Sequence, residues 1–208
     1  METYDTIKNK NVIKFIDYVK GQSQLFGVKF DLRDTDYVVL NNVHCAGYFS
    51  TDLKNQSPEL VVALKDSRWL QLLVHESCHM DQWAEKSKLW EKATAMDKID
   101  NWLNGIDYPT RHIRNTINII RDLELDCERR TVKKIIDWKL PVDIDLYIRK
   151  ANVYIFFHNY LKVTRKWKHP DYDNPNVYLV AAKKWYKNYK YVPQKLRKMF
   201  DEHLGLKE

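Results

Sequence analysis

The chain has 208 residues, 44% of them apolar and 30% charged, with a formal net charge of +7. This composition is typical of one globular domain with a closed core, and no stretch approaches the ~20 consecutive apolar residues of a membrane-spanning helix. The first twenty residues are charged throughout and lack a signal-peptide core, so we expect a cytoplasmic protein without membrane contact. Three widely spaced cysteines indicate neither a disulfide framework nor a zinc finger.

The first third of the chain changes from helical to strand-like patterning. Apolar residues at helical spacing predict an amphipathic helix over 5–21. Short β-prone runs separated by Asp, Asn, Gly, Ser and Pro then predict strands at 28–30, 37–40, 45–49 and 59–64. These strands indicate a small sheet, antiparallel or mixed, near the N-terminus.

The rest of the chain reads as helical. Asp66 or Ser67 can cap a helix that runs to about Lys88. Further helices are predicted at roughly 110–138, 143–163, 174–190 and 192–203, with prolines between them. We therefore predict a mainly helical α+β fold in a single domain, 1–208. The sheet and the first long helix occupy about 27–97, and the helical part occupies about 98–208.

The helix predicted after residue 66 carries the motif His75-Glu76-Ser77-Cys78-His79. Residues four apart lie one turn apart on the same helical face, so both imidazoles can reach one metal ion while Glu76 lies beside them. The flanking residues are strongly apolar, and buried polar groups without partners cost on the order of 1–3 kcal/mol each. A metal would supply that partner. The competing interpretation is a chance histidine pair in a metal-free helical protein.

Catalytic zinc takes three protein ligands, so a third donor must lie elsewhere. The metzincin extension fails, because Asp81 and Glu85 occupy the positions of its glycine and histidine. In the helix over 110–138, Glu124 and Glu128 fall on the apolar stripe and are expected to point inward. Two alternatives stay open: the glutamates form buried salt bridges, or His112 is the third ligand.

With these residues the chain resembles the HExxH zinc metallopeptidases called zincins, and among them the gluzincins, whose third ligand is a glutamate in an ExxxD pattern on a later helix. Glu124-Leu125-Asp126-Cys127-Glu128 matches that pattern with Glu in place of the final Asp. The resemblance covers about residues 36 to 131. It implies one Zn²⁺ held by His75, His79 and Glu124, with Glu128 orienting a ligating histidine.

The resemblance also implies how a substrate binds and reacts. Residues 45–50 would form an edge strand that pairs with an extended peptide through Ala46, Gly47, Tyr48 and Phe49. Glu76 would be the general base that activates a zinc-bound water against a peptide bond. Such sites add a donor for the oxyanion, and Tyr154 and His158, one turn apart on the helix over 143–163, are candidates.

A second hypothesis comes from charge. Lysine, arginine, tryptophan and tyrosine are abundant from Lys162 to Lys198, so the chain could be a basic, nucleic-acid-associated or regulatory protein in which the HExxH zinc site is structural or acts only on bound partners. Cys78 and Cys127 are interpreted as packing residues, because a thiolate would crowd a tetrahedral site. The sequence does not define an oligomeric state or the natural substrate.

Overall fold

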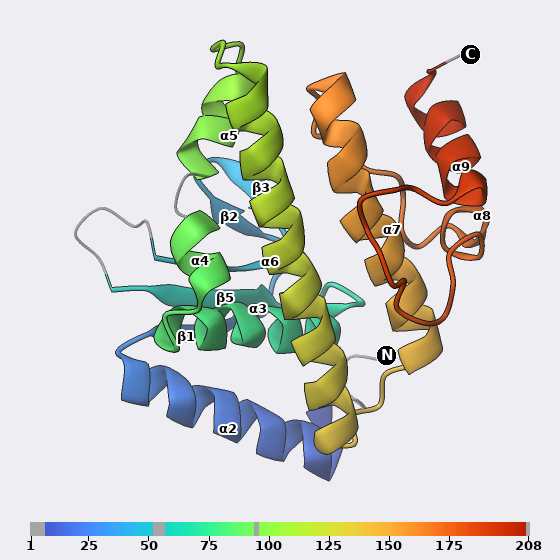
Figure 1. Cartoon of the computed structure of the whole chain (residues 1–208). Helices are drawn as coiled ribbons and strands as arrows, with labels where there is room; N and C mark the ends of the chain where they lie inside the picture. The colour runs from blue at the N-terminus through green and yellow to red at the C-terminus, as the bar shows by residue number, and fades with distance from the viewer. Residues whose placement is uncertain (1–6, 52–56, 94–95, 207–208) are drawn as a thin grey trace. The chain divides into compact units, whose positions relative to one another are not determined.

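The computed structural model describes residues 7–51, 57–93 and 96–206 (Figure 1). The chain forms two compact units, each with its own internal contacts. Unit 1 comprises Met1–Ser87 and Arg129–Val142, and unit 2 comprises Lys88–Glu128 and Asp143–Glu208. One helix, α6, is shared, because it runs unbroken from Thr110 to Asp137.

The described part of unit 1 contains two complete helices, the last third of α6, a mixed sheet and a hairpin. Its elements are α2 (Lys10–Phe26), β1 (Lys29–Arg33), β2 (Val38–Leu40), β3 (Val43–Cys45), β4 (Gly47–Ser50), β5 (Glu59–Ala63) and α3 (Trp69–Ala84). The three-stranded sheet has the order β1-β5-β4, with β1 parallel and β4 antiparallel to β5, while β2 and β3 form a separate antiparallel hairpin. The expected small sheet is therefore confirmed, and it is mixed.

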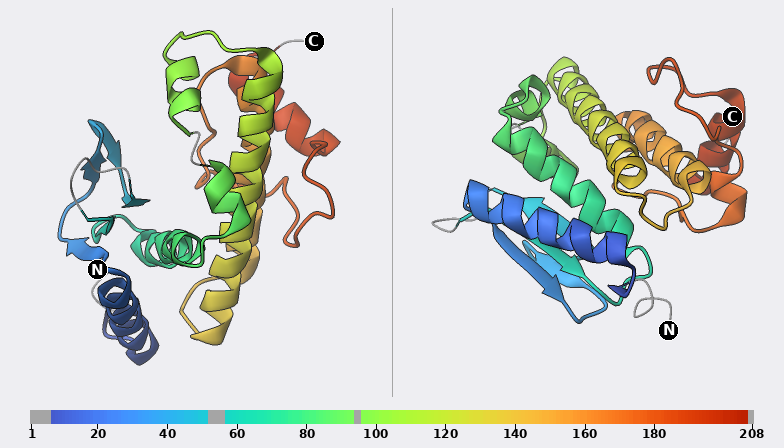
Figure 2. Two further views of the ribbon diagram at one scale, coloured as in Figure 1. Left: turned by 60° about the vertical axis from the view of Figure 1, so that its left-hand side comes forward. Right: turned by 90° about the horizontal axis from the view of Figure 1, so that it is seen from below.

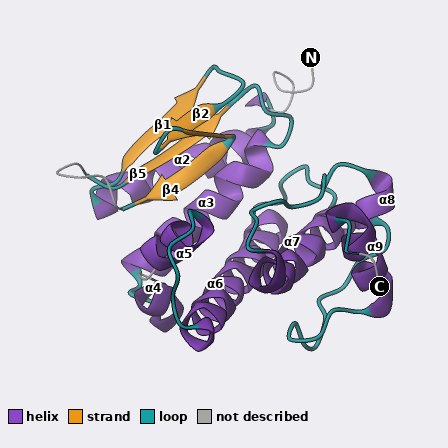
Figure 3. Ribbon diagram, turned by 90° about the horizontal axis from the view of Figure 1, so that it is seen from above, coloured by secondary structure: helices purple, strands orange, loops and turns teal. Residues whose placement is uncertain are grey.

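Strand β5 lies at the centre of this unit, and all five of its residues are buried. Side chains of a strand alternate between the two faces of the sheet. Val61 and Ala63 pack with Val38 of the hairpin, while α2 and α3 lie side by side on the other face (Figures 2 and 3). This double cover explains why β5 is apolar after its first residue, Glu59, and α3 begins a short turn after the strand ends.

Unit 2 is helical in its described part. It contains α4 (Lys88–Ala93), α5 (Met96–Leu103), the first two thirds of α6, α7 (Ile144–Thr164), α8 (Pro175–Tyr178) and α9 (Gln194–Leu204). Asp143 caps α7 by accepting a hydrogen bond from the Leu146 amide, and α9 ends at Gly205, whose positive φ of 65° suits glycine. Aromatic residues of α7 form the core against the segment that leads to α9.

One helix prediction is wrong. Within the segment 174–190, only Pro175–Tyr178 is helical, as α8. The rest of the segment has no regular secondary structure and is hydrogen-bonded to α7. Side chains of α7 bind its carbonyl oxygens: Asn152 donates to Ala182 and Lys184, and Asn159 donates to Tyr189, at 2.8–3.0 Å. Because these carbonyls are satisfied by α7, the segment does not need helical hydrogen bonds.

The other long elements agree with the sequence to within a few residues, except the first helix, which begins at Lys10 and continues to Phe26. The cap predicted for α3 also differs. The backbone cap is Arg68, and the carboxylate of Asp66 accepts a hydrogen bond from the Arg68 amide at 2.7 Å, one turn before the helix. Among the described residues, no helix combines the length and apolarity needed to cross a membrane.

Candidate metal centre

Helix α3 presents the two histidines of the motif on one face. The His75 and His79 rings are 4.8 Å apart between centroids and nearly perpendicular. His79 is 9% exposed, and His75 is half-buried. Leu73, Val74 and Met80 of the same helix are buried and anchor it in the core. The predicted placement of both imidazoles on one helical face is thus seen in the structure.

Gln82 determines which nitrogen of His79 can bind a ligand. The Nδ1 atom of His79 lies 2.9 Å from Oε1 of Gln82, which is completely buried. An amide oxygen can only accept, so in this arrangement Nδ1 carries the proton and Nε2 is the ring nitrogen that can act as a metal ligand. Sequence analysis did not identify Gln82, although its position three residues after His79 on a helix was a usable signal.

Glu76 is connected to the edge of the sheet. Its carboxylate accepts a hydrogen bond from the Phe49 amide of β4 at 2.8 Å, and the side chain is 9% exposed. In the described part of the sheet β4 is an edge strand, since it pairs only with β5. The general-base candidate and the strand expected to bind a peptide are therefore direct neighbours.

The C-terminal part of α6 packs beside α3 within unit 1. The Thr131 hydroxyl donates to the Cys78 sulfur at 3.6 Å. The Lys134 amine donates to the Ser77 hydroxyl at 2.9 Å and forms an ion pair with Asp81 at 2.7 Å. These contacts fix the register of α6 along the helix that carries the motif.

Cys127 lies one helical turn before Thr131, on the same unbroken helix. Its Sγ and one ring nitrogen each of His75 and His79 all lie within 4.8 Å of one another, so these three residues form a possible metal-binding group. Histidine and thiolate ligands suit zinc, but the group by itself does not define the metal.

The sequence assigned Cys127 to packing and gave the third position to Glu124. Glu124 is half-buried and lies three residues before Cys127, on the same stripe of α6. Its role as a ligand stays a prediction. The inward stripe itself is observed, since Glu128 is 6% exposed while Asp122, Arg129 and Lys133 are on the exposed side. His112, the alternative ligand, is exposed.

Within unit 2, the carboxylate of Glu128 accepts a hydrogen bond from the Tyr147 hydroxyl of α7. This contact holds the Glu128 carboxylate in the interior, and the buried salt bridge that the sequence left open for these glutamates stays a prediction. The predicted role of Glu128 as a partner of a ligating histidine stays a prediction, and the hydrogen-bond partner of His79 Nδ1 in the structure is Gln82.

His158 is completely buried on α7, and its ring contacts those of Tyr154 and Trp167. Burial lowers its pKa, against the opposing effect of the Glu124 charge. Its Nδ1 lies 3.1 Å from the Tyr154 carbonyl oxygen, which can only accept, so the proton is on Nδ1 and Nε2 is an acceptor. This tautomer favours Tyr154 over His158 as a hydrogen-bond donor to an oxyanion.

The four residues assigned to the edge strand have different surroundings. Tyr48 is buried and donates a hydrogen bond to Glu59, so its side chain supports the sheet. A Cβ on Gly47 would lie 3.1 Å from the Val61 carbonyl oxygen, which explains the glycine by close packing against β5. Ala46 accepts a hydrogen bond from the Ala63 amide. Phe49 is the residue that contacts the motif.

Comparison with known proteins adds no assignment. No protein-family model, curated protein or solved structure matches the chain.

Proposed function

We propose that this protein is a zinc-dependent metallopeptidase, in which His75 and His79 hold the ion and Glu76 is the general base. The observation that carries the proposal is the histidine pair on one face of α3, whose rings are 4.8 Å apart, together with the buried Gln82 amide that fixes the orientation of the His79 ring. Ligating histidines characteristically have such a hydrogen-bond partner on the ring nitrogen that does not bind the metal.

The residues present fit a zinc ion. Two imidazoles come from consecutive turns of α3, and α6 offers the thiol of Cys127 and, one turn away, the predicted carboxylate of Glu124. Zinc bound there would act as a Lewis acid and would lower the pKa of water to about 7. The proposal requires only one of the two α6 side chains as a third ligand.

The chain's own residues supply the remaining chemistry. Glu76 accepts a proton from the attacking water and passes it to the leaving amine. The Phe49 amide, which binds the Glu76 carboxylate, orients this base and joins it to β4. An extended peptide added to the open edge of β4 would thus bring its carbonyl groups near the base.

The test compares Glu76→Gln with Glu85→Gln. Glu85 lies just after the last turn of the same helix and is exposed, so it is a matched control for the loss of one carboxylate. We expect Glu76→Gln to retain bound zinc and to lose hydrolysis of a quenched-fluorescent peptide library by about 10³-fold or more, because the general base is removed. Glu85→Gln should retain both. Cleavage by Glu76→Gln at the wild-type rate, or absence of zinc from the wild type, would refute the proposal.

A further inference from the structure

Unit 2 carries a basic segment that the proposed reaction does not use. Residues 162–198 contain eleven lysines and arginines but only two acidic residues, Asp171 and Asp173. Asp173 is ion-paired with Lys150, which lies outside the segment, and Asp171 accepts a hydrogen bond from the Asp173 amide. The positive charge of the segment is therefore not neutralised from within it.

Many of these cations are exposed and have no acidic partner. Within the described part of the chain, six of them form no ion pair: Lys166, Lys168, Lys184, Lys187, Lys190 and Lys195. A solvated face on an ordinary globular protein mixes both signs of charge. An excess of one sign of charge attracts a polyanion instead.

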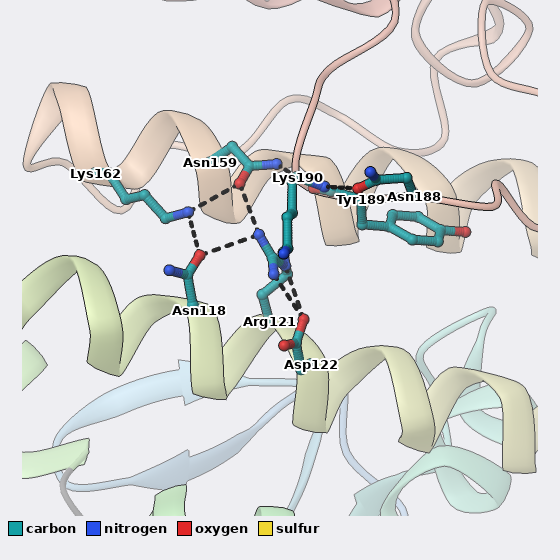
Figure 4. A network of polar contacts seen from close by, with 8 residues as sticks. All are labelled: Asn118, Arg121, Asp122, Asn159, Lys162, Asn188, Tyr189 and Lys190. Carbon is teal, nitrogen blue, oxygen red and sulfur yellow. Dashed lines mark hydrogen bonds and ion pairs between the residues drawn. The ribbon is translucent and has the colours of Figure 1, made fainter.

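A polar network beside this segment joins Lys162 to one cation from outside it, Arg121 (Figure 4). Arg121 of α6 is only 3% exposed, and its guanidinium donates to Asn118 and Asn159 at 3.1 Å. The Lys162 amine binds the same two amide oxygens, so both cations share neutral acceptors. Asp122 is the one carboxylate among the residues drawn, and it forms an ion pair with Arg121. Arg121 is therefore ion-paired, whereas the Lys162 amine is bound by the neutral oxygens of Asn118 and Asn159.

The electrostatic effect of this excess is visible in two places. The pKa of Lys162 is lowered to about 8, first by burial and then by the charges of Arg121 and Arg114. The pKa of His203 on α9 is lowered by burial and by the charge of Lys168.

Two exposed aromatic residues are interleaved with the lysines. Trp167 is 49% exposed between Lys166 and Lys168, and Tyr191 is 76% exposed directly after Lys190. The Trp167 ring makes an edge contact with Phe157 at 5.6 Å, which holds it while much of it remains accessible. Exposed aromatic rings beside cations are the elements on which proteins stack unpaired bases.

We infer that unit 2 binds single-stranded nucleic acid, with Lys166, Lys168 and Lys190 contacting phosphates and with Trp167 and Tyr191 stacking on bases. A duplex is a poorer fit, because its bases are already stacked and paired. The inference goes beyond the proposed peptidase activity and does not depend on it.

The experiment measures fluorescence anisotropy of a labelled oligothymidine of about 20 nucleotides across a salt series. The test variant is Lys166→Gln, Lys168→Gln and Lys190→Gln combined. Its control combines Lys10→Gln, Lys14→Gln and Lys20→Gln, which removes the same charge from exposed positions of α2 in unit 1. Each lost phosphate contact lowers the salt slope by about 0.7, so we expect a decrease of about 2 and an affinity loss of about tenfold or more. The control should bind as the wild type does.

Tyr191 tests the stacking component. Tyr191→Ser should weaken binding roughly five- to a hundredfold, and Tyr191→Phe should not, because the ring rather than the hydroxyl stacks on the base. The inference is overturned by no binding at low salt, by equal weakening in both triple variants, or by equal affinity for a duplex. It is also overturned if inorganic phosphate at matched ionic strength displaces the oligonucleotide, since the site would then be one for small phosphates.

Discussion

Replacing Gln82 by leucine should weaken metal binding without altering any proposed ligand. Gln82 is completely buried, and its Oε1 accepts the hydrogen bond of His79 Nδ1 at 2.9 Å. Leucine has a similar volume but cannot accept, so the buried Nδ1–H would lose its partner, at a cost of about 1–3 kcal/mol. That range agrees with the roughly 10–100-fold loss of metal affinity seen when the partner of a ligating histidine is removed.

The assay is a zinc titration in competition with a chromophoric chelator. Gln82→Glu keeps an acceptor at this position, so it should bind zinc at least as tightly as the wild type does. Gln71→Leu provides the control for an amide lost elsewhere on the same helix, where the side chain is half-buried. Equal zinc affinity for the wild type and Gln82→Leu, in proteins of equal helicity, would refute the assignment of His79 as a ligand oriented by Gln82.

Two other predictions concern packing and ionisation. Gly47→Ala should lower the unfolding free energy by about 1–3 kcal/mol, because the new Cβ would lie 3.1 Å from the Val61 carbonyl oxygen and 3.3 Å from Val62 Cγ2. Gly21→Ala is the control, because Gly21 lies in helix α2 with open space around the added Cβ, and it should raise the unfolding free energy by about 0.5–1 kcal/mol. Both variants are measured by thermal unfolding, and an unchanged stability of Gly47→Ala would contradict the close packing. Lys162 should titrate near its pKa of about 8 when followed by NMR of its ¹³C-methylated amine. This pKa lies below the unfolded value of ~10.4, so at pH values between about 8 and ~10.4 the unfolded chain binds more protons than the folded chain does. The stability of the fold should therefore rise with pH across that range. Titration of Lys162 near 10 would contradict the prediction.

The sequence predicted most accurately the elements in which a regular apolar pattern extends over many residues. Helices α6 and α7 each show the 3.6-residue pattern over twenty or more residues, and their bounds agree within about one residue. The segment 174–190 was misassigned because its conformation depends on Asn152 and Asn159, which lie far away in sequence and bind its carbonyl oxygens. Such long-range side-chain contacts leave no local pattern.

The candidate site shows the same division. His75, Glu76 and His79 were found because their spacing is local to one helix, and the inward stripe of α6 because it is periodic. The proximity of Cys127 to the histidines depends on how α6 lies along α3, which contacts such as that between Thr131 and Cys78 determine. Composition and spacing cannot supply that register.

The buried guanidinium of Arg121 was also beyond prediction. Its position on α6 adjoins the apolar stripe, where an arginine is ordinarily unfavourable. It is 3% exposed because Asn159 and Asn118 accept its hydrogen bonds, and Asn159 is 38 residues away.

A crystal structure of the zinc-loaded protein, with anomalous diffraction measured at the zinc edge, tests the central claim most directly. We predict one anomalous peak within about 2.0–2.1 Å of a ring nitrogen of both His75 and His79, with its third protein ligand from α6. Sulfur at about 2.3 Å would identify Cys127, and oxygen at about 2.0–2.2 Å would identify Glu124. A peak elsewhere, or no peak beside the two histidines at saturating zinc, would contradict the metallopeptidase proposal.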